Sequence, residues 1–180
     1  PKLDHWISIG TNQRILVRTG KVDIGQRIST ALALIAAEEL DVKFEDIDIA
    51  RTETGVDPDE GITSGSNSME QAGNAIRAAA ATARQHLLAL AAKTLKVNKS
   101  SLEVSDGLIQ SRDTNQATTY WELAGGQLFG IDVNPGVKAK EPEFYTKIGK
   151  PIVSKGISEI VTGKPYFVQD MQLPGMLHAR

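Results

Sequence analysis

Cysteine is absent from the 180-residue sequence. This absence excludes disulfide bonds, a zinc site with cysteine ligands and any iron–sulfur cluster held by the chain itself. No run of Lys and Arg marks a basic face, so no nucleic-acid partner is expected. The longest apolar run, residues 31–37, is far shorter than the roughly 20 residues that span a bilayer. These absences leave the compartment open.

The remaining composition is that of a globular domain. Hydrophobic residues make up 41% of the chain, charged residues 23%, and the net charge is −2. A chain of this length buries roughly 70% of its unfolded surface, which is enough for a sizeable core. It begins at Pro1 and ends at Arg180 within an apolar stretch, so either its ends were trimmed or it is a fragment of a longer protein.

Hydrophobic periodicity predicts an α+β fold. Residues 5–9 and 14–17 are β-rich runs on either side of a turn, which is typical of a hairpin. A helix rich in Ala and Leu is expected over residues 28–40. The alternation of Ile47 and Ile49 with aspartates predicts a half-buried strand.

The pattern of a helix end followed by a strand occurs twice. Four apolar positions recur 55 residues later, so that Leu40, Val42, Ile47 and Ile49 match Leu95, Val97, Leu102 and Val104. We therefore predict two similar helix–strand units, packed as helices on one face of a mixed sheet and followed by an irregular C-terminal connector. The expected division is residues 1–144 for the main unit and 145–180 for the connector.

Local signals predict where several elements begin or end. Asn67 with Glu70 predicts the cap of the longest helix. Residues 106–107 are an Asp-Gly pair, typical of a tight hairpin, and Thr119 with Glu122 predicts a capping box.

A first polar corner, residues 23–27, precedes the helix expected at 28–40. Gly25 could supply a positive φ or a close backbone approach, and the Gln26 amide can both donate and accept hydrogen bonds. Arg27 could add bidentate contacts to a phosphate. The alternative is a turn glycine with a solvated Gln and a surface Arg.

A second polar corner precedes the longest helix. Its hydroxyl groups and free N–H groups could form an anion-binding nest, contributed by Thr63, Ser64, Gly65, Ser66 and Ser68. The alternative is a helix cap within a polar loop. Two such corners in one small domain favour a site for a phosphate-bearing cofactor. A second hypothesis is a non-catalytic α+β module whose Ser/Gly loop binds a small anion or a protein partner.

No metal ligands are predicted. His5, His86 and His178 lack the mutual spacing of a metal site. The acidic residues at 57–60 lack the spacing of a calcium loop and are expected to be solvated.

Three segments resemble one enzyme family in the same chain order. TGKVDIGQRISTALALIAAEELDV is similar to the molybdopterin-binding segment of the xanthine dehydrogenase and aldehyde oxidase family, and TSGSNS resembles its second cofactor loop. YTKIGKP and VTGKPYFVQDMQLPGMLHAR resemble the start of its hammerhead-like domain. The order is similar to large subunits of the bacterial isoquinoline 1-oxidoreductase or nicotinate dehydrogenase type.

The resemblance implies an oxidoreductase that hydroxylates aldehydes or N-heterocycles, with oxygen derived from water and hydride passing to a molybdenum sulfido ligand. Molybdenum–molybdopterin, with the cytosine dinucleotide form favoured, would lie against Gly25, Gln26 and Arg27 and bind the hydroxyl corner. Implied partners are the rest of the large subunit, a separate iron–sulfur subunit and a cytochrome acceptor. The implied setting is a bacterial complex, cytoplasmic or membrane-associated.

Two departures from the family pattern matter. The family corner reads Gly-Gln-Gly, whereas Arg27 stands in place of the last glycine. The catalytic glutamate of the family lies in a later Gly-rich stretch that has no match here, so no catalytic residue is assigned and this piece alone is expected to be inactive.

Overall fold

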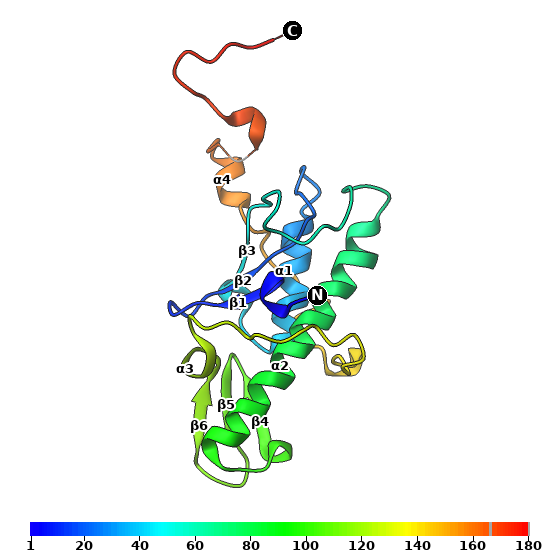
Figure 1. The fold of residues 1–180 in the computed structure, drawn as a ribbon. Helices are drawn as coiled ribbons and strands as arrows, with labels where there is room; N and C mark the ends of the chain where they lie inside the picture. The colour runs from blue at the N-terminus through cyan, green and yellow to red at the C-terminus, as the bar shows by residue number, and fades with distance from the viewer. Residues whose placement is uncertain (166, 180) are drawn as a thin grey trace.

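The fold combines two small β-sheets with helices, as a computed structural model describes it for residues 1–165 and 167–179 (Figure 1). The first sheet has the order β1 (Ile7–Ile9), β2 (Ile15–Val17) and β3 (Ile47–Ile49). β1 and β2 form the predicted antiparallel hairpin, and β3 runs parallel to β2. This sheet is therefore mixed.

The second sheet is wholly antiparallel. It consists of β4 (Leu102–Ser105), β5 (Leu108–Ser111) and β6 (Ala117–Thr119). The prediction of a single mixed sheet was wrong. β4 pairs with β5 across the tight turn at residues 106–107, because pairing across that turn needs no long-range contact, and it never reaches β3.

Two helices pack side by side and form the centre of the core. α1 (Ile28–Leu40) begins and ends as predicted, and α2 (Asn74–Leu95) crosses it along buried alanines (Figure 1). Small side chains let the two backbones approach closely, and the fully buried ones are Ala33, Ala36, Ala37, Ala79, Ala80, Ala83 and Ala91.

The repeat seen in the sequence is also visible in the local structure. Asp41 and Lys96 end the two helices with left-handed φ values of 52° and 55°. The next residue in each copy, Val42 or Val97, donates its N–H back to a helix carbonyl oxygen, at 3.2 and 3.1 Å. A 3₁₀ turn and a strand follow in both copies, although the strands join different sheets.

Asn67 does not cap the longest helix. It already has helical dihedral angles, φ −66° and ψ −20°, and its side chain makes no capping bond because a cap requires an extended residue. A six-residue π-helix, Ser68–Gly73, precedes α2 instead. The capping box of Thr119 and Glu122, at the start of α3 (Tyr120–Ala124), is confirmed.

The chain after residue 129 has little regular structure, but part of it is fixed to α1. Backbone N–H groups of Thr146, Lys147 and Ile148 donate to the carboxylate of Glu38 at 3.0, 2.6 and 2.9 Å. Beyond this contact come α4 (Ile157–Val161) and a tail that leads away from the body of the molecule (Figure 1).

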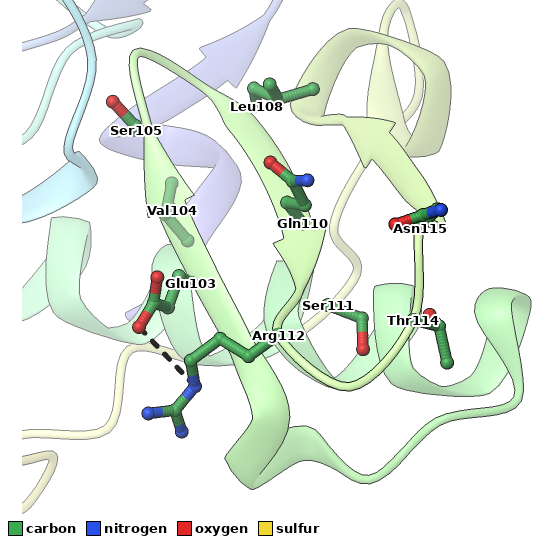
Figure 2. Close-up of a pocket in the computed structure, with 9 residues that line it drawn as sticks. All are labelled: Glu103, Val104, Ser105, Leu108, Gln110, Ser111, Arg112, Thr114 and Asn115. Carbon is green, nitrogen blue, oxygen red and sulfur yellow. Dashed lines mark ion pairs between the residues drawn. The ribbon is translucent and has the colours of Figure 1, made fainter.

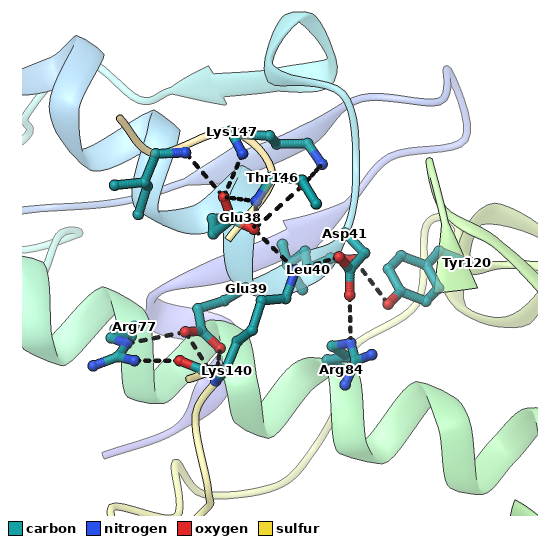
Figure 3. A network of polar contacts seen from close by, with 11 residues as sticks. Glu38, Glu39, Leu40, Asp41, Arg77, Arg84, Tyr120, Lys140, Thr146 and Lys147 are labelled. Atoms are coloured by element: carbon teal, nitrogen blue, oxygen red, sulfur yellow. Dashed lines mark hydrogen bonds and ion pairs between the residues drawn. The ribbon is translucent and has the colours of Figure 1, made fainter. Parts of the chain in front are cut away.

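Glu38 lies in a network of charged groups at the end of α1 (Figure 3). Its carboxylate is fully buried and also accepts from Lys140 Nζ at 3.0 Å, while Lys140 Nζ contacts Asp41 as well. Glu39 accepts from Arg77 Nε at 3.0 Å and from the backbone N–H of Lys140. Each buried charge in the network therefore has a partner, as burial requires.

The pKa of Glu38 predicts a loss of stability in acid. Burial would raise this pKa, but hydrogen bonds from Ile148, Lys147 and Lys140 outweigh burial and lower it to about 2. The stabilisation is therefore present above the ordinary pKa of 4.5 and disappears as pH falls toward 2, a change of about 3 kcal/mol. This loss of stability is measured as the difference between the unfolding free energies from urea titrations at neutral pH and at a pH near the lowered pKa.

The Glu38→Gln variant should show a shallower fall of stability between these two conditions. Glu143→Gln is a matched control, because Glu143 is exposed and lies shortly before the residues that bind Glu38. An equal pH dependence in Glu38→Gln and the wild type would contradict the assignment.

Candidate functional site

The two polar corners predicted from the sequence are joined in the structure. Residues 19–22 run beside the loop of residues 51–66, and Val22 N donates to Thr63 Oγ1 at 3.0 Å across a sequence separation of 41. Neither segment is part of a sheet, so side chains rather than a strand ladder connect them. The first corner therefore lies directly beside the start of the second.

Close backbone approach and ion pairing hold the same two segments together. A Cβ on Gly20 would lie 2.3 Å from the carbonyl oxygen of Pro58 and 3.2 Å from Glu60 N. Arg18 pairs with Asp57 at 3.3 Å, and the Asp57 side chain is only 2% exposed. The expectation that the acidic residues of this loop are all solvated was therefore wrong, because Asp57 and Glu60 both bind the first segment.

Asp23 organises the first corner and begins α1. Its Oδ1 accepts from the backbone N–H groups of Gly25 and Arg27 at 3.0 and 3.3 Å, and its Oδ2 accepts from Ser29 Oγ at 2.7 Å. Partial burial alone would raise the pKa of Asp23, but these three hydrogen bonds outweigh it and lower the pKa. An ionised carboxylate thus satisfies free N–H groups at the helix start.

The Gln26 amide closes the first corner. Nε2 donates to the carbonyl oxygen of Val22 at 3.0 Å, and Oε1 accepts from Ile24 N at 2.6 Å. One N–H and one lone pair stay unused on this exposed amide. Gly25 has φ +108° and no atom within 4 Å of its missing Cβ, so its backbone is open to close approach. Arg27 follows with φ 64° and is half-buried.

The second corner presents hydroxyl groups ahead of the π-helix. Ser64, Gly65 and Ser66 are exposed, Thr63 is half-buried and Ser68 is 9% exposed. In the described part of the chain, the side chains of Ser64, Ser66 and Ser68 have no hydrogen-bond partner. Gly65 and Ser66 both have φ 62°, so the chain makes a left-handed turn at these two residues, and neither backbone N–H has a hydrogen-bond partner in the described part of the chain. The corner can therefore donate several hydrogen bonds to an anion.

Apolar side chains lie exposed at both corners. Ile24 is 73% exposed, Ile62 79% and Met69 49%. Large apolar side chains next to unpaired hydroxyls suit a ligand that carries both an apolar ring and anionic groups. A phosphate-bearing pterin has this chemistry, so the residues fit the predicted cofactor.

Other features of the structure do not add to this site. No group of three or more His, Cys, Asp or Glu in residues 1–165 and 167–179 could hold a metal ion. None of the helices described is both long and apolar enough to cross a membrane. A hollow of about 360 Å³ lies on the second sheet, beside the Glu103–Arg112 ion pair and far from the corners (Figure 2).

Comparison with protein families identifies the domain. The family described as the molybdopterin cofactor-binding domain matches residues 3–168. The chain belongs to this family. The family resemblance stated from the sequence is thereby confirmed.

Curated relatives of this molybdopterin cofactor-binding domain are subunits of larger enzymes. The chain is 31% identical to a nicotinate dehydrogenase subunit of Pseudomonas putida over 99% of its length, and 33% identical to the gamma subunit of the 6-hydroxypseudooxynicotine dehydrogenase complex of Paenarthrobacter nicotinovorans over 67%. It is 24% identical to the beta subunit of isoquinoline 1-oxidoreductase of Brevundimonas diminuta over 97%. The chain spans 15% of the first two relatives and 27% of the third.

Solved structures share the fold of the molybdopterin cofactor-binding domain. CO dehydrogenase from Oligotropha carboxidovorans matches 76% of this chain with a TM-score of 0.59 and 27% identity, over 18% of its own chain. Quinoline 2-oxidoreductase from Pseudomonas putida 86 matches 66% with a TM-score of 0.55 and 25% identity, over 15% of its own chain. Both are far longer than the present chain.

Sequence reasoning missed the residues that join the corners. Asp23 could be placed in the turn, but nothing local marks Arg18, Thr19 or Asp57 as contacts. Their partners lie tens of residues away, so no spacing rule finds them. The candidate ligand-binding residues themselves were predicted from local glycine and hydroxyl patterns, and their contacts with a cofactor stay a prediction.

The close approach at Gly20 predicts a specific defect in Gly20→Ala. The new methyl would meet the Pro58 carbonyl, which is backbone and cannot rotate away, so we expect a loss of about 1–3 kcal/mol in stability. Urea unfolding measures this loss. Gly136→Ala is the control, since the Cβ there would meet only the side chain of Asn134, at 3.4 Å. Equal stability of the two variants would show that the loops are not tightly apposed.

Proposed function

We propose that the chain is the cofactor-binding portion of the large subunit of a molybdenum hydroxylase that oxidises N-heterocycles or aldehydes. The observation that carries the proposal is the junction of two corners, one with an open glycine backbone and one with unpaired hydroxyls, in a domain of the molybdopterin-binding family. Three relatives are named for nicotinate, isoquinoline and quinoline, which favours an N-heterocycle as substrate.

The proposed cofactor contacts come from both corners. Gly25 would let the pterin approach the backbone, while Gln26 retains one donor and one acceptor for it. Arg27 would add a contact near the phosphates. The hydroxyl and N–H groups of the second corner would bind the pterin and its phosphates, through Thr63, Ser64, Gly65, Ser66 and Ser68. When bound, molybdopterin would supply the redox chemistry.

The remaining parts of the enzyme lie outside this chain in the proposal. The rest of the large subunit would provide the glutamate base and the substrate pocket, and a separate iron–sulfur subunit would carry electrons toward an acceptor such as a cytochrome. Relatives named as subunits, one of them of a complex, support this division. We also propose that residues 145–180 lead from the cofactor segment, residues 1–144, into a hammerhead-like domain.

Cofactor analysis of the whole enzyme tests the proposal. Elemental analysis should find about one molybdenum atom in each large subunit, and acid hydrolysis of the extracted cofactor should release CMP rather than GMP. Enzyme purified from a molybdenum-replete host without molybdenum or pterin would contradict the proposal and favour a non-catalytic module. Release of GMP would correct only the nucleotide form.

Gly25→Ala should lower cofactor occupancy without an equal loss of stability. The methyl meets no protein atom, so it disturbs the folded chain only through the positive φ, but it would stand where the pterin approaches. We expect occupancy consistent with about tenfold weaker binding, or ~1.4 kcal/mol. Gly149→Ala is the matched control, with φ +85° and no atom within 4 Å. Full occupancy in Gly25→Ala would remove Gly25 from the site.

A further inference from the structure

Lys21 is buried between the two corners. Its side chain is 3% exposed, and Nζ donates to the carbonyl oxygens of Glu60 and Ile62 at 2.5 and 2.9 Å. A lysine is almost never buried without partners, because removing an ammonium group from water is costly. Here the partners are backbone carbonyls of the loop that leads into the second corner.

Glu60 completes the contact in the opposite direction. Its carboxylate accepts from Thr19 Oγ1 at 2.5 Å and from Gly20 N at 2.8 Å. The Lys21 side chain of the first segment thus binds the backbone of the loop, and the Glu60 side chain of the loop binds the backbone of the first segment. We call this reciprocal contact the Lys21–Glu60 clamp. Thr52 adds to it by donating to the carbonyl oxygen of Lys21 at 3.2 Å.

The Lys21–Glu60 clamp fixes the direction of the second corner. Ile62, whose carbonyl is held by Lys21, immediately precedes Thr63, whose hydroxyl is held by Val22 N. Two successive residues are therefore fixed just before the unpaired hydroxyls of Ser64 and Ser66. The loop has no strand pairing of its own, so these contacts decide where the hydroxyls lie.

The positive charge of Lys21 is not balanced by an ion pair. In residues 1–165 and 167–179, no carboxylate oxygen lies within 4.0 Å of the Lys21 ammonium, and one of its three N–H donors is unused. The Glu60 carboxylate in the same clamp likewise makes no ion pair within 4.0 Å among these residues, so the clamp carries one charge of each sign and is neutral overall.

We propose that Lys21 is a positioning residue for cofactor binding, which sets the second corner through the Glu60 and Ile62 carbonyls. The identity of the ligand in this inference rests on the proposed function, whereas the clamp rests on the hydrogen bonds described above. Lys21 need not touch the cofactor, since it acts by fixing residues 62–68 in place. Its removal should therefore loosen the loop and lower cofactor occupancy together.

Lys21→Met in the whole enzyme tests this inference. Methionine keeps the apolar stem but leaves two carbonyls without a donor. By mass spectrometry, we expect amide hydrogen exchange in residues 53–66 to accelerate about tenfold, and molybdenum content to fall by a similar factor, each equal to ~1.4 kcal/mol. Lys43→Met is the control, because Lys43 is exposed and its side chain makes no hydrogen bond or ion pair with the described residues.

Two further variants keep the test decisive if Lys21→Met does not fold. Lys21→Arg keeps the charge and can donate to two carbonyls, so it should restore part of the occupancy. Glu60→Gln weakens the clamp from the loop side and should accelerate exchange in the same residues. These variants separate loss of the clamp from a general loss of stability.

Each outcome bears on one of the two claims. Unchanged exchange in both Lys21→Met and Glu60→Gln would overturn the clamp. Faster exchange with unchanged molybdenum content would overturn the positioning role. If wild-type enzyme lacks molybdenum, the proposed function fails and the positioning role fails with it, whereas faster exchange in Lys21→Met would still establish the clamp.

Discussion

The structure depends on charged side chains that bind backbone groups of irregular segments at the two ends of α1. At the C-terminal end, Glu38 lies where the helix dipole disfavours a carboxylate, by about 0.3–1 kcal/mol. It nevertheless stays ionised, because three backbone N–H groups and Lys140 donate to it. Hydrogen bonds to a charged group contribute about 1.5–3 kcal/mol each, which exceeds the dipole term. The start of the connector, residues 146–148, is thereby held although these residues form no strand or helix.

The same solution operates at the N-terminal end. Asp23 binds N–H groups of the residues just before α1, and Lys21 and Glu60 join this segment to a loop about 40 residues away. Buried polar backbone must find partners, and these segments have no sheet to supply them. Side-chain charges therefore replace the hydrogen-bond ladder at each end of one apolar helix.

Features set by neighbouring residues could be predicted from the sequence. The bounds of α1, the hairpin at residues 106–107 and the capping box at Thr119 depend on contacts a few residues apart. The prediction that Asn67 caps the longest helix was wrong although it rests on a local motif, because the π-helix that follows places Asn67 in a helical conformation. The prediction of a single mixed sheet was wrong for a different reason. Apolar alternation predicts that a strand forms but carries no information about which sheet it joins.

The same distinction between local and long-range contacts applies to the candidate site. Its candidate cofactor contacts were predicted from local glycine and hydroxyl patterns, and they stay predictions. The clamp that joins the corners was not predictable, because Lys21 reads as an ordinary surface lysine beside Gly20. Only the fold shows that this lysine is buried and that its partners are carbonyls.

The two corners also differ in how completely they satisfy themselves, and this difference bears on how they would bind one ligand. In the first corner, Asp23 and part of the Gln26 amide bind the corner's own backbone, so hydrogen bonds within the chain hold its conformation. The second leaves the hydroxyls of Ser64 and Ser66 unpaired on a left-handed turn. The backbone of the first corner would therefore contact a planar ring by shape, while the free donors of the second corner would bind the anionic groups of the same ligand by hydrogen bonds. Joining the two through buried side chains means that binding need not also assemble the site, which lowers the entropy that a ligand must overcome.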